Sequence, residues 1–349
     1  MDRRRIRAGG VFIGGGAPVT VQSMTNTPTA DVAATAAQIE RLTDAGCELV
    51  RVAVPDMDAA RAIEKIKERI KIPLVADIHF DHRLALAAAE AGADKIRVNP
   101  GNIGGDEKVR AIAALCREKG IPIRVGVNGG SLEREILAKY GGVTPEAMVE
   151  SALGHIRLLN KFDFDDICVS VKASDTRLTV AAYRLLYART PYPLHLGVTE
   201  AGTEYIGVIR SAVGIGTLLS EGIGDTLRVS LTAAPEREVS AGIEILKAAG
   251  LRAGGARLIS CPTCGRCKID LIAISEQVER RLSEVQGDLT VAVMGCAVNG
   301  PGEARAADFG VAGGDGEGVL FRRGEVVKKA PADRLVDELF ELIAAARHY

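Results

Sequence analysis

Four of the seven cysteines lie after residue 260, at spacings that suit a metal ion or an iron–sulfur cluster. Cys261, Cys264 and Cys267 form a C-x2-C-x2-C run, and Cys296 follows in the segment MGCAVNGPGE, residues 294–303. Thiolates on one turn with another from a distant loop commonly hold iron–sulfur clusters and zinc. A zinc ribbon would normally add a second, separate C-x2-C pair, and a radical-SAM enzyme would need C-x3-C-x2-C. The spacing therefore favours an iron–sulfur cluster, while zinc and free thiols stay open.

A second group of candidate residues is basic and lies in or just after β-like segments of the first 230 residues. Its members are Arg51, Arg97, Arg124, Lys172 and Arg228. Burial of even one unpaired charge is costly, so five cations gathered in one place need counter-charges. Asp56, Asp77 and Glu200 would neutralise some of them in an internal salt-bridge network, but these carboxylates are too few for the whole group. The simplest missing partner is an anion with more than one negative charge, and a diphosphate fits the bidentate geometry of arginine.

The elements that must position these residues alternate regularly from residue 19 onward. The expected strands are residues 19–23, 49–54, 74–78, 95–98, 121–127, 167–172, 194–198 and 227–231. The expected helices are residues 31–45, 57–70, 82–91, 107–119, 145–161, 176–188, 203–219 and 236–249. Eight strands and eight helices over roughly 250 residues predict an α/β fold of the (β/α)8 TIM-barrel type. A doubly wound open sheet is the alternative, but the early glycine cluster at residues 14–16 leads into a strand, so the Rossmann fingerprint is absent.

The pattern changes after Gly254 and Gly255. Strands are expected at residues 257–260, 290–294, near 311, 319–322 and 325–328, with helices at 269–283 and 332–347. We therefore expect two domains: a substrate-binding barrel over residues 1–252 and a small α+β domain over residues 253–349 that carries the cysteine cluster. A hairpin within residues 11–17 is expected to close the bottom of the barrel.

Catalytic groups of such barrels lie at the carboxyl ends of the strands, and residues two apart on a strand point to the same side. The side chains expected at this mouth are Arg51, Asp77, His79, Arg97, Asn99, Arg124, Asn128, Ser170, Lys172, His195, Thr199, Glu200, Arg228 and Ser230. The loops at residues 99–102 and 128–131 add backbone donors. His79 is either a substrate contact or a hydrogen-bonded core residue. Cys47, Cys116 and Cys168 lie in apolar surroundings and are expected in the core.

Composition excludes several classes of protein. Hydrophobic residues make up 47% and charged residues 26% of the 349 residues, as in an ordinary folded protein. A formal net charge of −1 argues against non-specific nucleic-acid binding, which needs an excess of Lys and Arg. We see no secretory signal, and no apolar run approaches the roughly 18 residues of a membrane-spanning helix. The expectation is a soluble cytoplasmic protein with no nucleic-acid or membrane partner.

Four motifs together resemble one enzyme family. They are VQSMT at residues 21–25, RVNPGN at 97–102, CPTCGR at 261–266 and MGCAVNGPGE at 294–303. They closely resemble the 4-hydroxy-3-methylbut-2-enyl diphosphate synthases of the bacterial two-domain type. The similarity covers essentially the whole chain, and the last motif is highly specific. The chain lacks the large insertion that sets the longer plant-type form apart.

The resemblance implies a [4Fe-4S] oxidoreductase of the methylerythritol phosphate route to isoprenoids. Its reaction would be the two-electron reductive ring opening and dehydration of 2-C-methyl-D-erythritol 2,4-cyclodiphosphate to (E)-4-hydroxy-3-methylbut-2-enyl diphosphate. The implied cluster ligands are Cys261, Cys264, Cys296 and Glu303, and Glu303 ranks above Cys267. Because carboxylate oxygen is a weaker ligand for iron than thiolate, one iron could exchange Glu303 for a substrate oxygen.

The resemblance also assigns substrate contacts and partners. The implied substrate-binding residues are Arg51, Arg97, Asn99, Arg124, Asn128, Lys172, Thr199, Arg228 and Ser230. Thr199 and Glu200 match positions near the departing hydroxyl, where Glu200 could supply a proton. The implied electron donor is reduced ferredoxin or flavodoxin. The implied assembly is a homodimer in which the barrel of one chain faces the cluster domain of the other.

Two rival hypotheses remain. One is a zinc-stabilised barrel that binds a phosphorylated metabolite without redox chemistry. The other is a pterin-type synthase barrel, which would account for the first 250 residues but would not explain the function of the cysteine domain.

Overall fold

The chain forms two structural units, Met1–Arg252 and Ala253–Tyr349. This computed structural model describes residues 3–282, 284–285, 287–296 and 304–347. Within those ranges, no helix combines the length and the apolar character needed to cross a membrane.

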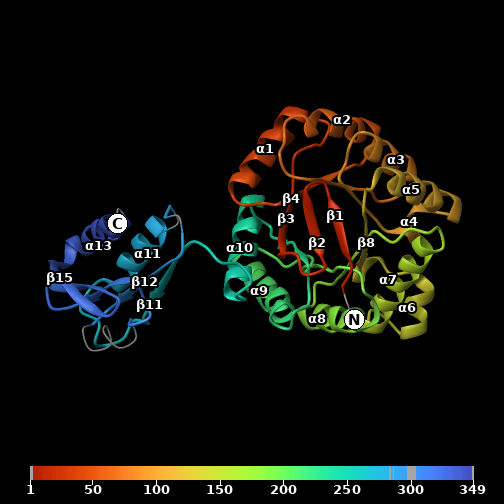
Figure 1. The fold of residues 1–349 in the computed structure, drawn as a ribbon. Helices are drawn as coiled ribbons and strands as arrows, with labels where there is room; N and C mark the ends of the chain where they lie inside the picture. Colours follow the sequence, from red (N-terminus) through yellow and green to blue (C-terminus); the bar gives the residue numbers. More distant parts are fainter. Residues whose placement is uncertain (1–2, 283, 286, 297–303, 348–349) are drawn as a thin grey trace. The chain divides into compact units, whose positions relative to one another are not determined.

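A ring of parallel strands forms the centre of the first unit (Figure 1). The strands are β3 (Thr20–Met24), β4 (Leu49–Ala53), β5 (Leu74–Asp77), β6 (Lys95–Val98), β7 (Ile123–Asn128), β8 (Ile167–Lys172), β9 (His195–Leu196) and β10 (Thr226–Leu227). They are hydrogen-bonded in the order β8-β7-β6-β5-β4-β3-β10-β9. A parallel bridge between Val169 and Leu194 closes the ring. Helices cover the outside, so these strands are buried on both faces and consist largely of β-branched and other apolar residues.

The helices of the first unit surround the ring. They are α1 (Val32–Asp44), α2 (Met57–Lys67), α3 (His82–Glu90), α4 (Pro100–Ile103), α5 (Asp106–Lys119), α6 (Arg134–Tyr140), α7 (Pro145–Asn160), α8 (Thr176–Arg189), α9 (Glu204–Ser220) and α10 (Pro235–Ala248), with a 3-10 turn at Gly129–Ser131. Local chemistry sets several of their starts. The side chains of Asp31, Asp56 and Thr144 each accept a hydrogen bond from a backbone N–H in the first turn, which caps the helix.

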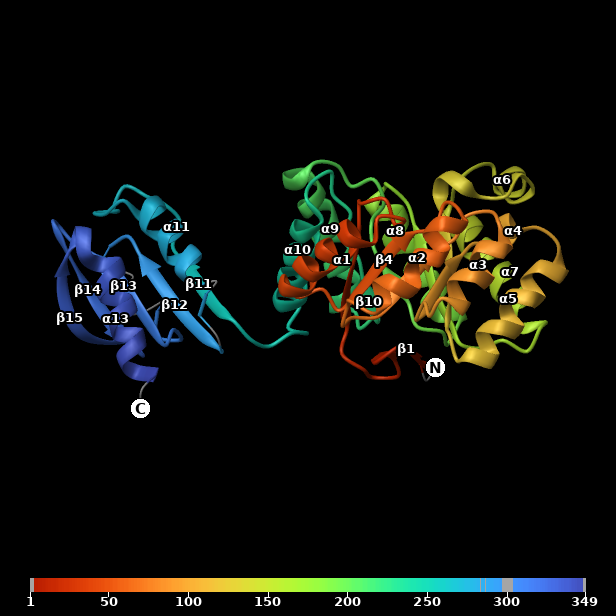
Figure 2. The same ribbon diagram turned by 90° about the horizontal axis from the view of Figure 1, so that it is seen from above.

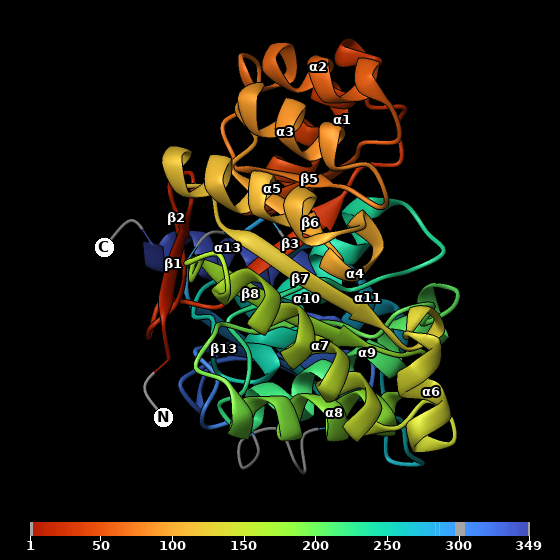
Figure 3. The same cartoon turned by 90° about the vertical axis from the view of Figure 1, so that its right-hand side faces the viewer.

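An amino-terminal hairpin closes the bottom of the barrel, at the opposite end from α6 (Figure 3). Its strands are β1 (Arg5–Ala8) and β2 (Val11–Gly14), paired antiparallel. Ile6, Ala8 and Ile13 pack against Leu49 and Cys168 in the barrel interior. The expected hairpin therefore exists but begins earlier, with its turn at Gly9, where φ is +54° and a side chain would be strained.

The second unit is a five-stranded sheet in the order β11-β12-β13-β14-β15 (Figure 2). The strands are β11 (Ala256–Ser260), β12 (Leu289–Met294), β13 (Phe309–Gly313), β14 (Glu317–Arg322) and β15 (Glu325–Pro331). The helices α11 (Leu271–Leu282) and α13 (Leu335–Arg347), the latter preceded by a 3-10 turn at Ala332–Arg334, pack on the sheet around a shared apolar core. The pairs β11–β12 and β12–β13 are parallel, so the carboxyl ends of β11 and β12 meet at one edge.

The structure confirms the predicted TIM barrel followed by a small α+β unit. Two helices were not expected: α4 has four residues and α6 has seven, and both are too short for a periodic pattern. The strands β9 and β10 have two residues each and are shorter than expected. Isolated bridges and single hydrogen bonds replace a regular ladder there.

Candidate active site and cysteine pocket

The five basic residues lie on or directly after five different strands of the barrel. Arg51 lies on β4, Arg97 on β6, Arg124 on β7, Lys172 at the end of β8, and Arg228 directly after β10. Strand register places Arg97 beside Arg124 and Asn128 beside Lys172. The structure therefore brings the predicted cations together inside one barrel.

Two glycines make room for these long side chains. A Cβ atom at Gly126 would lie 2.7 Å from Nε of Arg97. A Cβ atom at Gly197 would overlap Nζ of Lys172 and lie 2.7 Å from the carbonyl oxygen of Arg228. Each glycine thus leaves space on one strand for a cation that reaches across from its neighbour.

One buried carboxylate, Asp77, holds three basic side chains. Its Oδ1 accepts a hydrogen bond from Nη1 of Arg97 at 2.9 Å, and its Oδ2 lies 3.7 Å from Nε of Arg51 and 3.5 Å from Nε2 of His79. Burial alone would raise the pKa of Asp77, but Arg51, the hydrogen bond to His79 and the charge of Arg97 hold it well below its usual range. Asp77 is therefore an anion at all ordinary pH values. His79 itself is largely exposed, so it is not a core histidine.

A second buried carboxylate, Glu238 of α10, pairs with Arg228. Met24 also contacts the group: its Sδ lies 2.9 Å from Nε of Arg51 and 3.7 Å from Nη1 of Arg228. Three of the five cations therefore have a carboxylate partner, but only Asp77 was expected among these carboxylates. Asp56 caps α2 instead, and Glu200 forms no ion pair with the cations among the described residues.

Arg124 and Lys172 have no carboxylate partner among the residues that the structure describes. Arg124 is 1% exposed, and its Nη1 is 3.5 Å from Oε1 of Gln22, while its Nε has no hydrogen-bond partner. Burial and then the charge of Arg97 lower the pKa of Arg124 to about 10. Burial and the neighbouring cations Arg124 and Arg228 lower the pKa of Lys172 far below its usual range. Arg124 and Lys172 are therefore two basic side chains without a negatively charged partner among the described residues.

A further polar layer lies deeper in the barrel. Lys95 and His195 are fully buried, and neither Nζ of Lys95 nor either ring nitrogen of His195 has a hydrogen-bond partner within the described chain. Burial lowers the pKa of Lys95 to about 8, against an opposing effect of Cys168. Burial, Arg124 and Lys172 hold the pKa of His195 far below its usual range. His195 was predicted at the mouth, but the structure places it in the buried interior because it begins β9 rather than ending it.

Lys95 is expected to make the stability of the barrel depend on pH. Its folded pKa of about 8 lies below the ordinary value of 10.5, so the folded state binds fewer protons between these pH values. The free-energy cost of burying charged Lys95 therefore applies in full below about pH 8 and disappears by about pH 10.5. This change is on the order of 3 kcal/mol. We expect the free energy of unfolding of wild type minus that of Lys95→Met to rise over this range, measured by urea unfolding. Lys119→Met, at the exposed end of α5, is the control; a constant wild-type minus Lys95→Met difference would contradict the prediction.

The remaining predicted contacts lie at the carboxyl ends of the strands or within a few residues after them. Asn99 caps α4 by accepting a hydrogen bond from the N–H of Gly101 at 3.1 Å, Asn128 ends β7, and Thr199 and Ser230 are half-buried after β9 and β10. Glu200 is exposed and has φ of +53°, a left-handed conformation that is unusual for a residue with a side chain. Such strain is concentrated at functional sites. Arg210 stabilises this turn by donating to the carbonyl oxygen of Ala201 at 3.0 Å.

The cysteines of the second unit line a single cavity of about 170 Å³. Its lining is Cys261, Pro262, Cys264, Arg266, Cys267, Gly295 and Cys296. Cys261 directly follows β11, and Cys296 lies two residues after β12, so the parallel edge of the sheet supports both. The N–H of Gly295 donates to Sγ of Cys261 at 3.2 Å. The structure therefore brings together the four cysteines that the sequence singled out.

The four thiols differ in environment. Cys296 is buried, whereas Cys264 is exposed, and hydrogen bonds from the backbone and side chain of Arg266 lower the pKa of Cys264. Sγ of Cys267 donates to the carbonyl oxygen of Ile269 at 3.2 Å and lies where a side chain on Gly295 would be. Glu303, the fourth predicted ligand, lies outside the described residues. In the described ranges, no three Cys, His, Asp or Glu side chains already form a metal-binding group.

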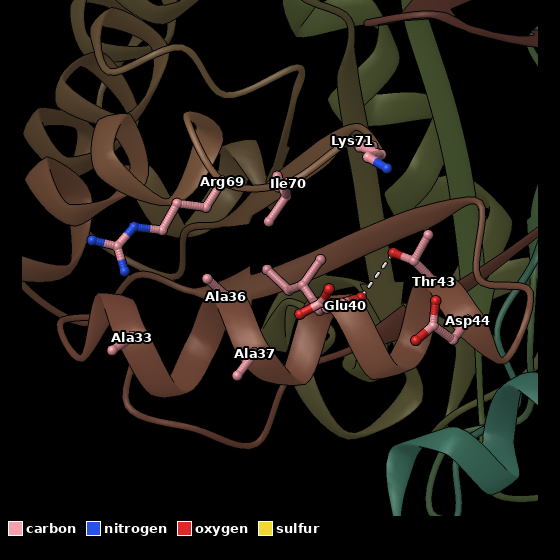
Figure 4. Close-up of a pocket in the computed structure, with 10 residues that line it drawn as sticks. Ala33, Ala36, Ala37, Glu40, Thr43, Asp44, Arg69, Ile70 and Lys71 are labelled. Carbon is pink, nitrogen blue, oxygen red and sulfur yellow. Dashed lines mark hydrogen bonds between the residues drawn. The ribbon is translucent and has the colours of Figure 1, made fainter.

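A larger hollow of about 330 Å³ lies on the outside of the barrel, against α1 and the chain at residues 69–71 (Figure 4). Alanines of α1 and the charged side chains of Glu40, Asp44, Arg69 and Lys71 line it. It contains none of the predicted site residues, so we assign it no function.

The buried Cys47, Cys116 and Cys168 are core residues, as expected. Burial raises the pKa of Cys47 to about 11 and that of Cys116 to about 12, so both remain thiols.

Sequence reasoning missed Glu238 altogether. The pattern that could have revealed it is a carboxylate on the buried face of α10, which it shares with Pro235, Val239 and Gly242.

Comparison with known proteins covers both units. Two family models match the chain: the GcpE TIM-barrel domain over residues 3–243 and the GcpE protein C-terminal domain over residues 257–345. A relative from Geobacter sulfurreducens named 4-hydroxy-3-methylbut-2-en-1-yl diphosphate synthase (flavodoxin) is 60% identical over 349 residues, covering 99% of each chain. A relative of the same name from Clostridium perfringens is 57% identical over 342 residues, covering 98% of each.

Solved structures of low sequence identity resemble part of the chain. Dihydropteroate synthase from Yersinia pestis aligns with a TM-score of 0.50 and 15% identity, over 70% of this chain and 97% of that chain. At this identity the likeness shows the fold and carries no statement about activity.

Proposed function

The chain belongs to the GcpE family, and from that membership we propose how its residues carry out the reaction of these synthases. The reaction is the reductive ring opening and dehydration of 2-C-methyl-D-erythritol 2,4-cyclodiphosphate to (E)-4-hydroxy-3-methylbut-2-enyl diphosphate. It belongs to isoprenoid precursor synthesis by the methylerythritol phosphate route. The relatives that match the chain over nearly its full length carry this enzyme name, so a zinc-stabilised binding barrel is not supported.

One observation carries the substrate assignment: Arg124 and Lys172 are buried cations that lack a carboxylate partner within the described residues. A diphosphate supplies the negative charge that this barrel does not supply itself. Arg51, Arg97 and Arg228 already share carboxylates, and the N–H groups that remain on each guanidinium are available to phosphate oxygens. Asn99, Asn128, Thr199 and Ser230 add neutral contacts around the ligand.

Glu200 is proposed to give a proton to the hydroxyl that leaves as water, with Thr199 beside it. Two facts support this role. Glu200 is exposed four residues after the end of β9, on the carboxyl side where barrel enzymes place their chemistry. Its left-handed backbone is a strained conformation that the turn around Ala201 maintains.

Cys261, Cys264, Cys296 and Glu303 are proposed to hold a [4Fe-4S] cluster. The donor set fits, because soft thiols from two strand edges and one loop line the same cavity. A cluster held there would supply the two electrons one at a time. Cys267 is proposed as a structural thiol, since its Sγ donates to the carbonyl oxygen of Ile269.

A reduced one-electron carrier must supply the cluster, and we propose ferredoxin or flavodoxin; the names of the relatives include flavodoxin. We also propose a cytoplasmic homodimer in which the barrel of one chain faces the cluster unit of its partner. The outer face of α9 supports self-association. Tyr205, Ile209 and Val213 follow one another by four residues there, and their exposed fractions are 76%, 45% and 56%.

The proposed function is tested by anaerobic turnover. Protein reconstituted with iron and sulfide, given the cyclodiphosphate and a chemical reductant, should release the linear diphosphate. The absence of product from brown protein with about four irons per chain would overturn the proposal.

The ligand assignment makes a separate prediction for Cys267 and Glu303. Cys267→Ala should keep nearly all the iron, because its sulfur already has a backbone partner. Glu303→Ala should leave the fold intact but slow reduction of the cyclodiphosphate by at least about tenfold. Iron per chain, circular dichroism and turnover are measured on both variants. Loss of the cluster in Cys267→Ala with retention in Cys261→Ala would reverse the assignment.

A further inference from the structure

Glu238 is a buried carboxylate that reaches the barrel site from an outer helix. It lies in the first turn of α10 and is 4% exposed. Its oxygens accept hydrogen bonds from Nε and Nη2 of Arg228, each at 3.3 Å, and from Oγ of Ser23 at 3.1 Å and the backbone N–H of Leu231 at 3.0 Å. These contacts use both carboxylate oxygens.

This arrangement decides which part of Arg228 is free. The two contacts at 3.3 Å occupy the side-on edge of the guanidinium, formed by Nε and Nη2. Nη1 points elsewhere, toward Sδ of Met24 at 3.7 Å, and Met24 also contacts Arg51. The end of the guanidinium that carries Nη1 therefore lies beside the other cations.

Glu238 also connects three parts of the barrel wall. Ser23 lies on β3, Arg228 directly follows β10, and Leu231 follows Ser230 in the loop after β10. Because one rigid carboxylate binds all three, the position of Arg228 and the path of the Ser230 loop depend on the same group.

We propose that Glu238 is a positioning residue for substrate binding: it holds Arg228 so that only its Nη1 end contacts the diphosphate, and it holds the adjacent Ser230 loop. The proposal rests on the proposed function of the barrel. It goes further by assigning a role to a residue that does not itself touch the substrate.

Because Glu238 is charged, its substitution can distinguish two roles that predict opposite changes in diphosphate affinity. If Glu238 only lowered the positive charge of the site, Glu238→Gln would make the site more cationic and should tighten diphosphate binding. If Glu238 positions Arg228, the same variant loosens the guanidinium and weakens binding. Glu238→Asp keeps the charge but moves the carboxylate, so only the positioning role predicts that it also weakens binding.

The experiment measures KM and kcat for the cyclodiphosphate, and the Kd of inorganic pyrophosphate by calorimetry, on the full chain loaded with iron and sulfide. We expect Glu238→Gln and Glu238→Asp each to raise KM about 10-fold or more while kcat changes less than about threefold. The Kd of pyrophosphate should rise in parallel. The control is Glu236→Gln, which removes an equal charge from the same helix at an exposed ion pair with Arg41 and should change neither constant.

Unchanged or lower KM and Kd in Glu238→Gln would overturn the positioning role, as would normal binding by Glu238→Asp. If a Glu238 variant does not fold, Ser23→Ala removes one contact of the carboxylate without a change of charge. It should raise KM in the same direction by a smaller factor, and an unchanged KM would count against the proposal. Failure of wild type to turn over the cyclodiphosphate would instead contradict the proposed function, while the pyrophosphate measurement would still test Glu238.

Discussion

Cys296→Ala is expected to abolish both iron binding and turnover while leaving the fold of both units intact. Cys296 is buried and lies two residues after β12, the second strand of the sheet. Its position is therefore set by the sheet, whereas Cys264 lies in an exposed turn that can adjust. Cys267 lines the same cavity, but its Sγ donates to the carbonyl oxygen of Ile269, so we do not expect it to replace the lost thiolate.

The measurements are iron per chain, the visible absorption of anaerobically reconstituted protein, and product formation. We expect iron to fall from about four per chain to below about one, and turnover to fall at least 1000-fold, because the electrons have no route to the substrate. Cys116→Ala is the matched control: Cys116 is a buried thiol of α5 that packs in the barrel core. It should retain full iron content and cost only about 1 kcal/mol of stability. Retained turnover in Cys296→Ala would contradict its role as a ligand.

Lys172→Met is expected to weaken substrate binding and to stabilise the unliganded barrel at the same time. Methionine keeps the length of the side chain but removes the charge. Lys172 is 9% exposed and has no ion pair or hydrogen bond in the part of the chain that the structure describes. Burial and four neighbouring arginines hold its pKa far below the usual range, which means that its positive charge destabilises the folded state.

Loss of a buried, charge-assisted contact with phosphate costs about 3 kcal/mol, which corresponds to a roughly 100-fold rise in KM or in the Kd of pyrophosphate. Removal of the uncompensated charge should raise the melting temperature of the ligand-free protein by a few degrees. Addition of pyrophosphate should then raise the melting temperature of wild type more than that of the variant. The control is Lys161→Met, which breaks an exposed pair with Asp106 and should change neither property appreciably. A variant that is less stable without ligand would show that Lys172 has a partner within the protein.

Much of the fold follows from short-range patterns. Strands such as β6 (Lys95–Val98) and β8 (Ile167–Lys172) have the predicted bounds, because short segments that contain β-branched residues and alternate with helix-like segments are typical of strands in a parallel sheet. The helices lie within a few residues of their predicted ends, where Asp31, Asp81 and Thr144 supply caps. The strands β9 and β10 are shorter than predicted, because regular backbone pairing with the neighbouring strands covers only two residues of each. Residue type alone does not set that length.

Most of the candidate site residues were also visible in the sequence, although Glu238 was not. A C-x2-C-x2-C run and a set of cations spaced along successive strands are local patterns, and the barrel rule places the ends of parallel strands together. The proposed roles of the cysteines, Glu303 and the mouth residues remain predictions. The structure adds that four cysteines share one cavity and that the cations share one barrel.

The sequence by itself determined the order of strands and helices, the cysteine run and the number of cations, since each depends on residues that are near one another in the chain. Only the tertiary structure decided which cations are neutralised. Ser23 and Glu238 are 215 residues apart, yet they share a hydrogen bond beside Arg228. Lys172 and Arg124 are as basic in the sequence as Arg97, but only Arg97 reaches Asp77 closely enough to share its charge. Charge pairing depends on distances of a few ångströms that strand register and helix packing set, and no local pattern encodes those distances.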